Sequence, residues 1–221
     1  MKNKKKYTLC AIGALLTALL LPALCACAPY DYSDRVSEIR SDLFLADTDD
    51  FSLTLACVSR EYPYADDGIP CPMTDTVEIT LVPADEVPDH AEVYFGESGG
   101  EASFSSAYGD FRYSQGVSAF PEGSVPIRVV WGDKSYEIAA TSVRTETTLT
   151  PKDALSAFVT AEKETLSAMK RDGAFCGEIA VRLLRRDKNY YYTAVTDGSE
   201  RIALLLDGET GDVLARRRDT L

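Results

Sequence analysis

Short runs of alternating apolar and polar residues, separated by proline and glycine, constrain the fold of this chain more than any other feature. Phe51, Leu53, Leu55 and Cys57 alternate with small or polar residues, which is the two-residue period of a strand with one buried face. Similar runs occupy residues 76–82, 91–95, 104–113, 127–131 and 136–139. Up to residue 146 the pattern therefore predicts about seven short strands, in an antiparallel sandwich or a small barrel.

Residues 34–44 do not follow this alternation. Val36, Ile39, Arg40 and Leu43 fall three and four residues apart, which is the spacing of side chains along one side of a helix. We therefore expect one or two helical turns before the first strand.

Residues 147–221 predict a helix followed by four strands. Thr150 suits an N-cap, Pro151 suits the first helical position, and Asp153 is placed to complete a capping-box-like pair. Four alternating runs then occupy residues 178–186, 190–196, 201–206 and 213–216. The predicted fold class is therefore α+β: an antiparallel β-sandwich-like domain over 34–146, followed by a helix-plus-four-strand antiparallel meander over 147–221.

Charge is divided unevenly between these two parts and supports a boundary near residues 144–150. Residues 28–146 contain 23 acidic and 7 basic side chains, a net charge of −16, whereas residues 147–221 contain 12 of each. The simplest explanation of the acidity is solubility. An acidic chain is also repelled by phosphate backbones, so no nucleic-acid partner is expected.

The first residues have the pattern of an export signal. Four lysines precede residue 7, and residues 9–26 carry no charge, as in a signal peptide with its apolar core. A retained single-span anchor is the alternative. Cleavage at an A-x-A site that uses Ala26 and Ala28 is also open, although Pro29 would then follow the cut.

The stretch Leu24-Cys25-Ala26-Cys27 resembles the lipobox of bacterial lipoproteins, which is a leucine, two small residues and a cysteine. The resemblance implies that residues 1–26 are removed, that Cys27 carries the lipid, and that residues 27–33 form a short tether. Two or more acyl chains would hold the protein stably on the extracytoplasmic face of the cell membrane without a spanning helix. The alternative is that both cysteines are merely small apolar members of an ordinary signal.

A second resemblance concerns Ala203-Leu-Leu-Leu-Asp-Gly-Glu-Thr-Gly-Asp-Val-Leu214. This stretch is similar to the apolar strand, Asp-x-x-Thr-Gly turn and final apolar pair of the PepSY domain, and the predicted helix precedes it in the expected order. The resemblance covers residues 147–221. It implies that the domain binds or inhibits a peptidase or has an extracytoplasmic regulatory role, and it supplies no catalytic residues.

Three cysteines follow Cys27: Cys57, Cys71 and Cys176. Outside the cytoplasm a pair of them can oxidise. Cys57 and Cys71 flank one loop and are the candidate disulfide, which would leave Cys176 over.

The loop between those two cysteines is a candidate recognition loop. It places Tyr62, Tyr64, Asp66 and Asp67 among prolines and a glycine, and tyrosines on an ordered loop suit recognition. The two aspartates could help to hold calcium, but no D-x-D-x-D-G register is present. A stiff loop without a ligand is the simpler interpretation.

The residues that catalysis would need are sparse. His90 is the only histidine, so any Ser-His-Asp or Cys-His arrangement would have to use it. The cysteine spacing matches no zinc site, and no phosphate-binding or nucleophile motif is present. We therefore expect no enzymatic activity, no metal and no cofactor. Because acidic residues abound, a hydrolase hidden in the acidic half stays an alternative.

The expected function is non-catalytic binding. The chain would be a membrane-anchored extracytoplasmic lipoprotein, held by the lipid on Cys27, that binds a protein or peptide partner in the cell envelope. Regulation of an envelope or secreted peptidase and a purely structural spacer are the alternatives. The arginines of residues 182–186 and 216–218 are interpreted as a solvated face rather than an anion site.

Overall fold

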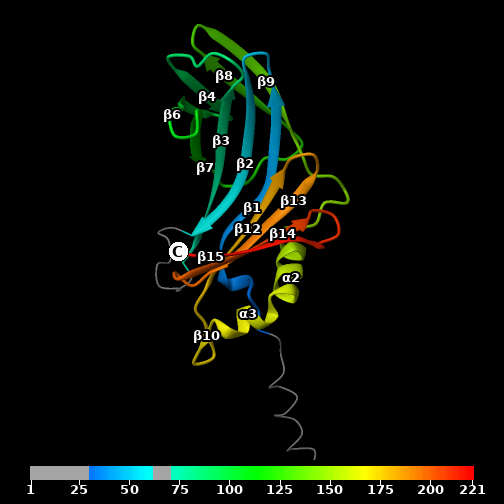
Figure 1. Ribbon diagram of the computed structural model, residues 1–221. Helices are drawn as coiled ribbons and strands as arrows, with labels where there is room; N and C mark the ends of the chain where they lie inside the picture. Colours follow the sequence, from blue (N-terminus) through cyan, green and yellow to red (C-terminus); the bar gives the residue numbers. More distant parts are fainter. Residues whose placement is uncertain (1–29, 62–70) are drawn as a thin grey trace, which may run out of the picture. The chain divides into compact units, whose positions relative to one another are not determined.

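The structure, a computed structural model, describes residues 30–61 and 71–221 (Figure 1). Ser33–Leu221 forms one compact unit. A 3-10 turn, η1 (Ser33–Arg35), precedes nine strands: β1 (Val36–Asp47), β2 (Phe51–Glu61), β3 (Met73–Pro83), β4 (Ala91–Phe95), β5 (Ser98–Glu101), β6 (Ser103–Ser105), β7 (Asp110–Gly116), β8 (Ser124–Trp131) and β9 (Lys134–Ser142). The remaining elements are α2 (Pro151–Ala161), α3 (Lys163–Ala168), β10 (Lys170–Arg171), β11 (Ala174–Phe175), β12 (Glu178–Arg185), β13 (Asn189–Thr196), β14 (Glu200–Asp207) and β15 (Val213–Thr220).

Strands β1 to β9 curl into a nearly closed sheet around an apolar core (Figure 1). The order is β6-β7-β3-β2-β1-β9-β8-β4-β5. Inward-facing side chains of opposite walls meet, and the rings of Phe51 and Trp131 lie 4.8 Å apart between centroids. Phe51, Leu55 and Val129 are fully buried. Each such side chain stabilises the fold by roughly 1.5–3 kcal/mol relative to an exposed one.

Strand β1 is shared between this curled sheet and the C-terminal strands. One edge of β1 pairs with β2 along most of its length. The other edge is divided, since its first part pairs in parallel with β12 and its last part pairs with β9, antiparallel, through Phe44 and Leu45. The order β1-β12-β13-β14-β15 then continues the sheet to its end at β15.

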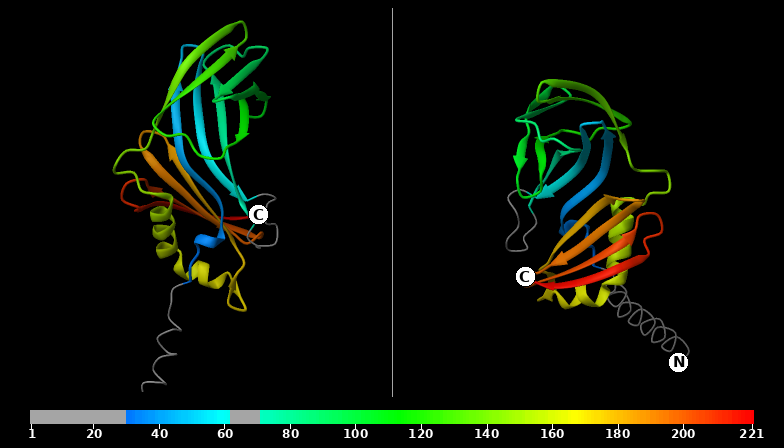
Figure 2. Two further views of the ribbon diagram at one scale, coloured as in Figure 1. Left: turned by 180° about the vertical axis from the view of Figure 1, so that it is seen from behind. Right: turned by 45° about the horizontal axis from the view of Figure 1, so that its top comes forward.

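Both helices lie on one face of β12 to β15 (Figure 2). Thr150 caps α2, and Asp153 returns the capping-box hydrogen bond, as predicted from the sequence. Phe158 of α2 and Leu166 of α3 are fully buried. The strands present alternate apolar side chains to this side, because consecutive residues of a strand point to opposite faces.

The predicted α+β fold class is wrong. The chain is mostly β, and its strands form a 13-stranded sheet together with the two-stranded β10-β11 hairpin. The strands after residue 177 fall close to the predicted residues, but they do not form a meander of their own, because β12 pairs with β1. The N-terminal strands are likewise one curled sheet and not two stacked sheets, since β1 and β9 are hydrogen-bonded.

Of the helical turns predicted over residues 34–44, the structure has only the 3-10 turn η1, and most of this segment is strand β1. The pairing of β1 with β2 shifts register between Arg40 and Asp42. Such a bulge inserts one residue and reverses the alternation of side chains. Phe44 consequently enters the core of the curled sheet, while Leu43 packs on the opposite face. The break in the two-residue period made the strand resemble a helix.

Arg144 closes the gap where β9 and β12 diverge from β1. Its guanidinium donates to the carbonyl of Ser41 on β1 at 3.1 Å and to the hydroxyl of Tyr191 on β13 at 3.0 Å. It also donates to the carbonyls of Thr148 and Leu149 at 3.2 and 3.1 Å. Backbone carbonyls that lack a strand partner are thus satisfied by one side chain.

Buried Asn189 extends this junction. Its side-chain amide donates to the carbonyl of Val143 at 2.8 Å and to the hydroxyl of Thr148 at 2.9 Å. The hydroxyl of fully buried Tyr191 donates to the carbonyl of Leu149 at 2.8 Å. The threonine-rich stretch near residues 144–150, interpreted above as a boundary, is therefore tied to β13 by a polar network.

Replacing Arg144 by methionine keeps the apolar stem but removes the donor from the three carbonyls. We expect the free energy of unfolding to fall by about 2–4 kcal/mol, measured by urea denaturation of a chain that starts at residue 28. Arg217→Met is the matched control, because the Arg217 side chain is 79% exposed, and it should change stability by less than about 1 kcal/mol. Equal effects of the two substitutions would contradict the role of Arg144.

Candidate functional site

The face of β12 to β15 opposite the helices carries a hollow that is lined by several arginines. A pocket of about 190 Å³ lies where β1 and β2 meet β12 and β13. We call it the arginine trough, and its principal side chains are Glu38, Arg60, Glu178, Arg182, Tyr192 and Arg201. Its floor is low because Ala180, Ala194 and Ala203 stand in register across three neighbouring strands.

Strand alternation places these side chains on one face. Ile179, Val181 and Leu183 of β12 are buried on the helix side, so Ala180 and Arg182 point the other way. Arg182 stands opposite Tyr192 in the register of β12 and β13, and its guanidinium carbon lies 5.8 Å from the ring centroid. The trough is therefore a consequence of the same alternation that builds the helix-covered face.

Glu38 lies at the centre of an ion-pair network in the trough. Nε and Nη2 of Arg182 donate to the two carboxylate oxygens of Glu38, each at 2.7 Å. This bidentate geometry is among the stronger polar contacts in proteins. Arg60 approaches Glu38 at 3.7 Å and Glu78 of β3 at 3.0 Å. The network thus joins β1, β2, β3 and β12.

The network fixes the charge of Glu38. Burial alone would raise the pKa of this carboxyl, but the hydrogen bond and charge of Arg182, together with the charges of Arg60 and Arg40, outweigh burial and hold the pKa below its usual value. Burial lowers the pKa of Arg40, and the charge of Glu38 partly offsets this. The Nε atom of Arg40 is buried and has no hydrogen-bond acceptor among the described residues.

Arg201 differs from the other arginines of the trough. Its side chain is exposed on β14 and forms no ion pair within residues 30–61 and 71–221. Asp219, which stands opposite it on β15, instead accepts a hydrogen bond from Arg217 at 2.7 Å. The lining of the trough holds three arginines and two glutamates, which leaves one positive charge in a chain whose formal net charge is −12.

A second hollow continues the arginine trough toward the edge of the sheet. It has a volume of about 320 Å³ and shares Tyr192 and Arg201 with the trough. Leu205 and Ala215 supply apolar surface beside them, and Arg217 supplies a further charge. The two hollows together cross the sheet from β1 to its last strand, β15.

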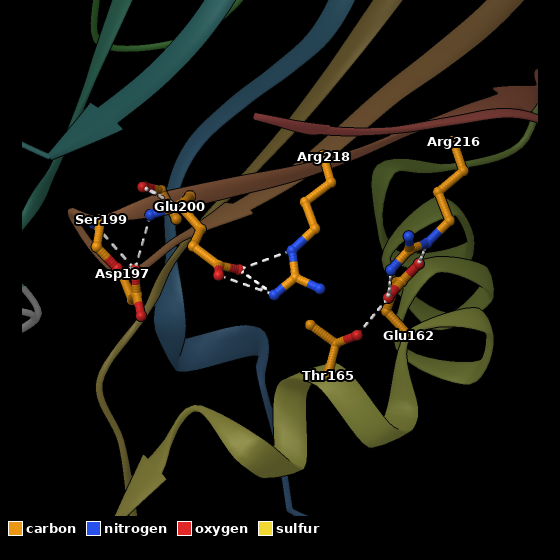
Figure 3. Close-up of polar contacts among 8 residues, drawn as sticks. Glu162, Thr165, Asp197, Ser199, Glu200, Arg216 and Arg218 are labelled. Carbon is orange, nitrogen blue, oxygen red and sulfur yellow. Dashed lines mark hydrogen bonds and ion pairs between the residues drawn. The ribbon is translucent and has the colours of Figure 1, made fainter. Parts of the chain in front are cut away.

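The arginines on the helix side of β15 are tied to carboxylates (Figure 3). Arg216 donates to both oxygens of Glu162 at 2.6 and 3.1 Å, and Thr165 donates to the same carboxylate at 2.6 Å. Arg218 donates to Glu200 at 2.5–2.9 Å. Buried Glu162 separates α2 from α3, so its pair with Arg216 fastens the edge strand to the helices. The pair of Arg218 with Glu200 joins β15 to the neighbouring strand β14.

A hollow of about 420 Å³ at the turns β1-β2, β3-β4 and β8-β9 is acidic, and Asp49, Asp85 and Asp133 are among its lining residues. Asp50 in this hollow is neutralised by Lys134, whose ammonium lies 2.6 Å away, and it also accepts a hydrogen bond from Tyr136. Within the described residues no group of three or more His, Cys, Asp or Glu side chains has an arrangement that could hold a metal ion.

Most of the site residues predicted from the sequence lie outside the described residues. This holds for the lipidation residue Cys27 and for the recognition-loop residues Tyr62, Tyr64, Asp66 and Asp67. The two cysteines of the candidate disulfide, Cys57 and Cys71, are not joined to each other in the structure. Cys57 is buried in the core of the curled sheet, and Cys71 donates its backbone N–H to buried Glu61 at 3.2 Å. His90 is exposed in the segment before β4.

The sequence pattern does not reveal the residues of the arginine trough. It places Arg182 on a solvated face and gives no signal that groups Glu38, Arg60 and Arg201. They come from four strands and share no local motif. The available signal was the charge itself, because Glu38 and Arg40 interrupt β1, and Arg60 and Arg182 interrupt otherwise apolar or small runs.

Comparison with family models, with curated proteins and with solved structures finds no match to this chain. Neither helix of the described part has the length and apolar character that crossing a membrane requires.

The structure predicts that Cys57 is chemically inert in the folded protein. Burial, with smaller contributions from the charges of Asp42 and Asp75, raises the pKa of its thiol to about 12, and only the thiolate reacts with alkylating agents. Iodoacetamide at pH 8 should therefore modify half-buried Cys176 before Cys57 in the native chain from residue 28. In denaturant without a reductant all three thiols should react. If the denatured chain gains only one modification, at Cys176, this would instead establish the Cys57–Cys71 disulfide.

Glu38→Gln tests the ion-pair network through its pH dependence. Because the pKa of Glu38 is lowered on folding, its carboxylate stabilises the native state above its usual pKa of 4.5, and this contribution is lost as the pH falls through the lowered native value. The variant should lose about 1–3 kcal/mol at pH 7 and less at pH 3, measured by urea unfolding at both values. Glu97→Gln, at an exposed residue, is the control. A loss that does not change with pH would contradict the assignment.

Proposed function

We propose that this chain is a membrane-anchored extracytoplasmic bacterial lipoprotein of the non-catalytic binding type, and that its partner docks on the face of β12 to β15 that carries the arginine trough. The observation that carries the proposal is the contrast between the two faces of these strands. Both helices cover one face (Figure 2), while the other keeps Arg201 exposed, together with Tyr192 and a low alanine floor.

The composition of this face suits recognition of a protein segment. Arginine and tyrosine are enriched where proteins bind one another, since both combine apolar surface with hydrogen-bond donors. The adjoining hollow leads to β15, which ends the sheet and pairs only with β14 among the described residues. The outer edge of such a strand offers backbone groups to an extended partner.

The placement in the envelope is supported by the N-terminal sequence. The export-signal pattern and the lipobox resemblance at Leu24-Cys25-Ala26-Cys27 support lipidation of Cys27. The PepSY resemblance, with its peptidase-regulating role, and the spacer role stay predictions.

Site-specific photocrosslinking in the native host tests the proposal. The full chain would carry a photoreactive phenylalanine analogue in place of Arg217, whose side chain is 79% exposed beside the trough. We expect a discrete crosslinked species with an envelope protein. The matched control places the analogue at Tyr108, which is 73% exposed on the curled sheet, and should give no such species.

Cys27→Ala in the same cells serves as the control for location. It should prevent lipidation and the cleavage that depends on it, so that the mature lipidated mass is no longer found and the uncleaved precursor accumulates. Crosslinking at Tyr108 alone, or at neither position, would overturn the assignment of the binding face. Unchanged processing of the Cys27→Ala variant would overturn the anchoring through a lipid on Cys27.

A further inference from the structure

We infer that the arginine trough receives a carboxylate of its partner, supplied by an aspartate or glutamate side chain of an extended acidic segment, and that Arg201 is the residue that binds it. The inference rests on the proposed function and names the chemistry of the partner. It follows from the charge balance, the size and the shape of the trough.

The charge balance favours a single negative charge. Arg182 is engaged by both oxygens of Glu38, and Arg60 approaches Glu38 and Glu78. Arg201 is the arginine of the trough that has no carboxylate partner within the described chain. A monovalent carboxylate would neutralise the remaining charge and accept two parallel hydrogen bonds from the guanidinium. A doubly charged phosphate would be repelled by Glu38 and Glu178 in the same pocket.

The size and shape favour a side chain of a peptide. About 190 Å³ is smaller than the 300–1,000 Å³ that is typical of pockets for drug-sized ligands. The floor of Ala180, Ala194 and Ala203 and the continuation past Leu205 toward Ala215 provide an open path across several strands. A polypeptide can lie along that path while one of its carboxylates reaches Arg201.

Arginine-detected NMR tests this inference on the chain from residue 28, which contains the whole compact unit Ser33–Leu221. The Nε–Hε signal of Arg201 would be followed while acetyl-Ala-Glu-Ala-amide is added. We expect a saturable shift that weakens with added salt. Acetyl-Ala-Gln-Ala-amide, which has the same shape without the charge, should cause no saturable shift.

Two variants with the same change of net charge make the assignment specific. Because Arg201→Gln removes the Nε–Hε group itself, binding to the variants is followed through the backbone amide signals of β13 and β14. Arg201→Gln should weaken binding of the glutamate peptide roughly tenfold, the value of one charge-assisted hydrogen bond. Arg186→Gln, at an exposed turn residue outside the trough, should change it less than about twofold. For both variants, thermal unfolding followed by circular dichroism confirms that the fold is retained.

Three results would overturn the inference. They are equal shifts with the glutamine peptide, equal weakening by the two variants, and tighter binding of inorganic phosphate, which would identify a phosphoryl ligand instead. If the peptide does not bind but Arg217 is crosslinked to a partner, the proposed binding function is retained and the acidic nature of the partner is refuted. If the peptide binds but no crosslink forms at Arg217, the carboxylate site is retained and the proposed envelope partner is refuted.

Discussion

The divided edge of β1 is the constraint on which the rest of the structure depends. The backbone groups on this edge of β1 pair with β12 in the first part of the strand and with β9 in the last part. At the division the backbone groups would lack partners, and an unsatisfied buried group is unfavourable by roughly 1–3 kcal/mol. Arg144 donates to the carbonyl of Ser41 at the division, and Asn189 and Tyr191 donate to the carbonyls of Val143 and Leu149 in the segment that follows β9. This division also brings Glu38 and Arg60 beside β12, which creates the arginine trough.

In the C-terminal strands, the alternation of side chains places ion-paired arginines on one face and an arginine without an ion pair on the other. On the helix side, Arg216 and Arg218 are matched with Glu162 and Glu200, and the edge strand is fastened to the helices. Charged side chains on an edge strand also discourage indiscriminate pairing with other chains. On the opposite face Arg201 has no such match. The distinction lies in the pairing of the arginines and not in their number.

The sequence was informative about elements and uninformative about their partners. Alternating runs located most strands, and Thr150 with Asp153 located the start of α2. Strand β1 was missed because its bulge disrupts the period. The pairing of β1 with β12 could not be predicted from local pattern, because nothing in either stretch specifies a partner so distant along the chain.

The same limit applies to the candidate site. Glu38, Arg60 and Arg201 are ordinary charged residues until the register brings them together, and the register is a property of the whole sheet. The composition of the chain was a poor guide for the same reason. A strongly acidic total conceals a local excess of positive charge, and the half with zero net charge contributes most of the basic surface.

The parallel pairing of β1 with β12 has a consequence for how the chain reaches its native state. Ser37 donates a hydrogen bond to the carbonyl of Ile179, 142 residues further along the sequence. Contacts of such separation slow folding, since the entropy of closing the intervening loop is lost before the contact forms. During synthesis, β1 must remain without this neighbour until nearly the entire polypeptide has been made. Nascent or prematurely terminated chains therefore display an open strand edge, which makes them substrates for chaperones and for aggregation.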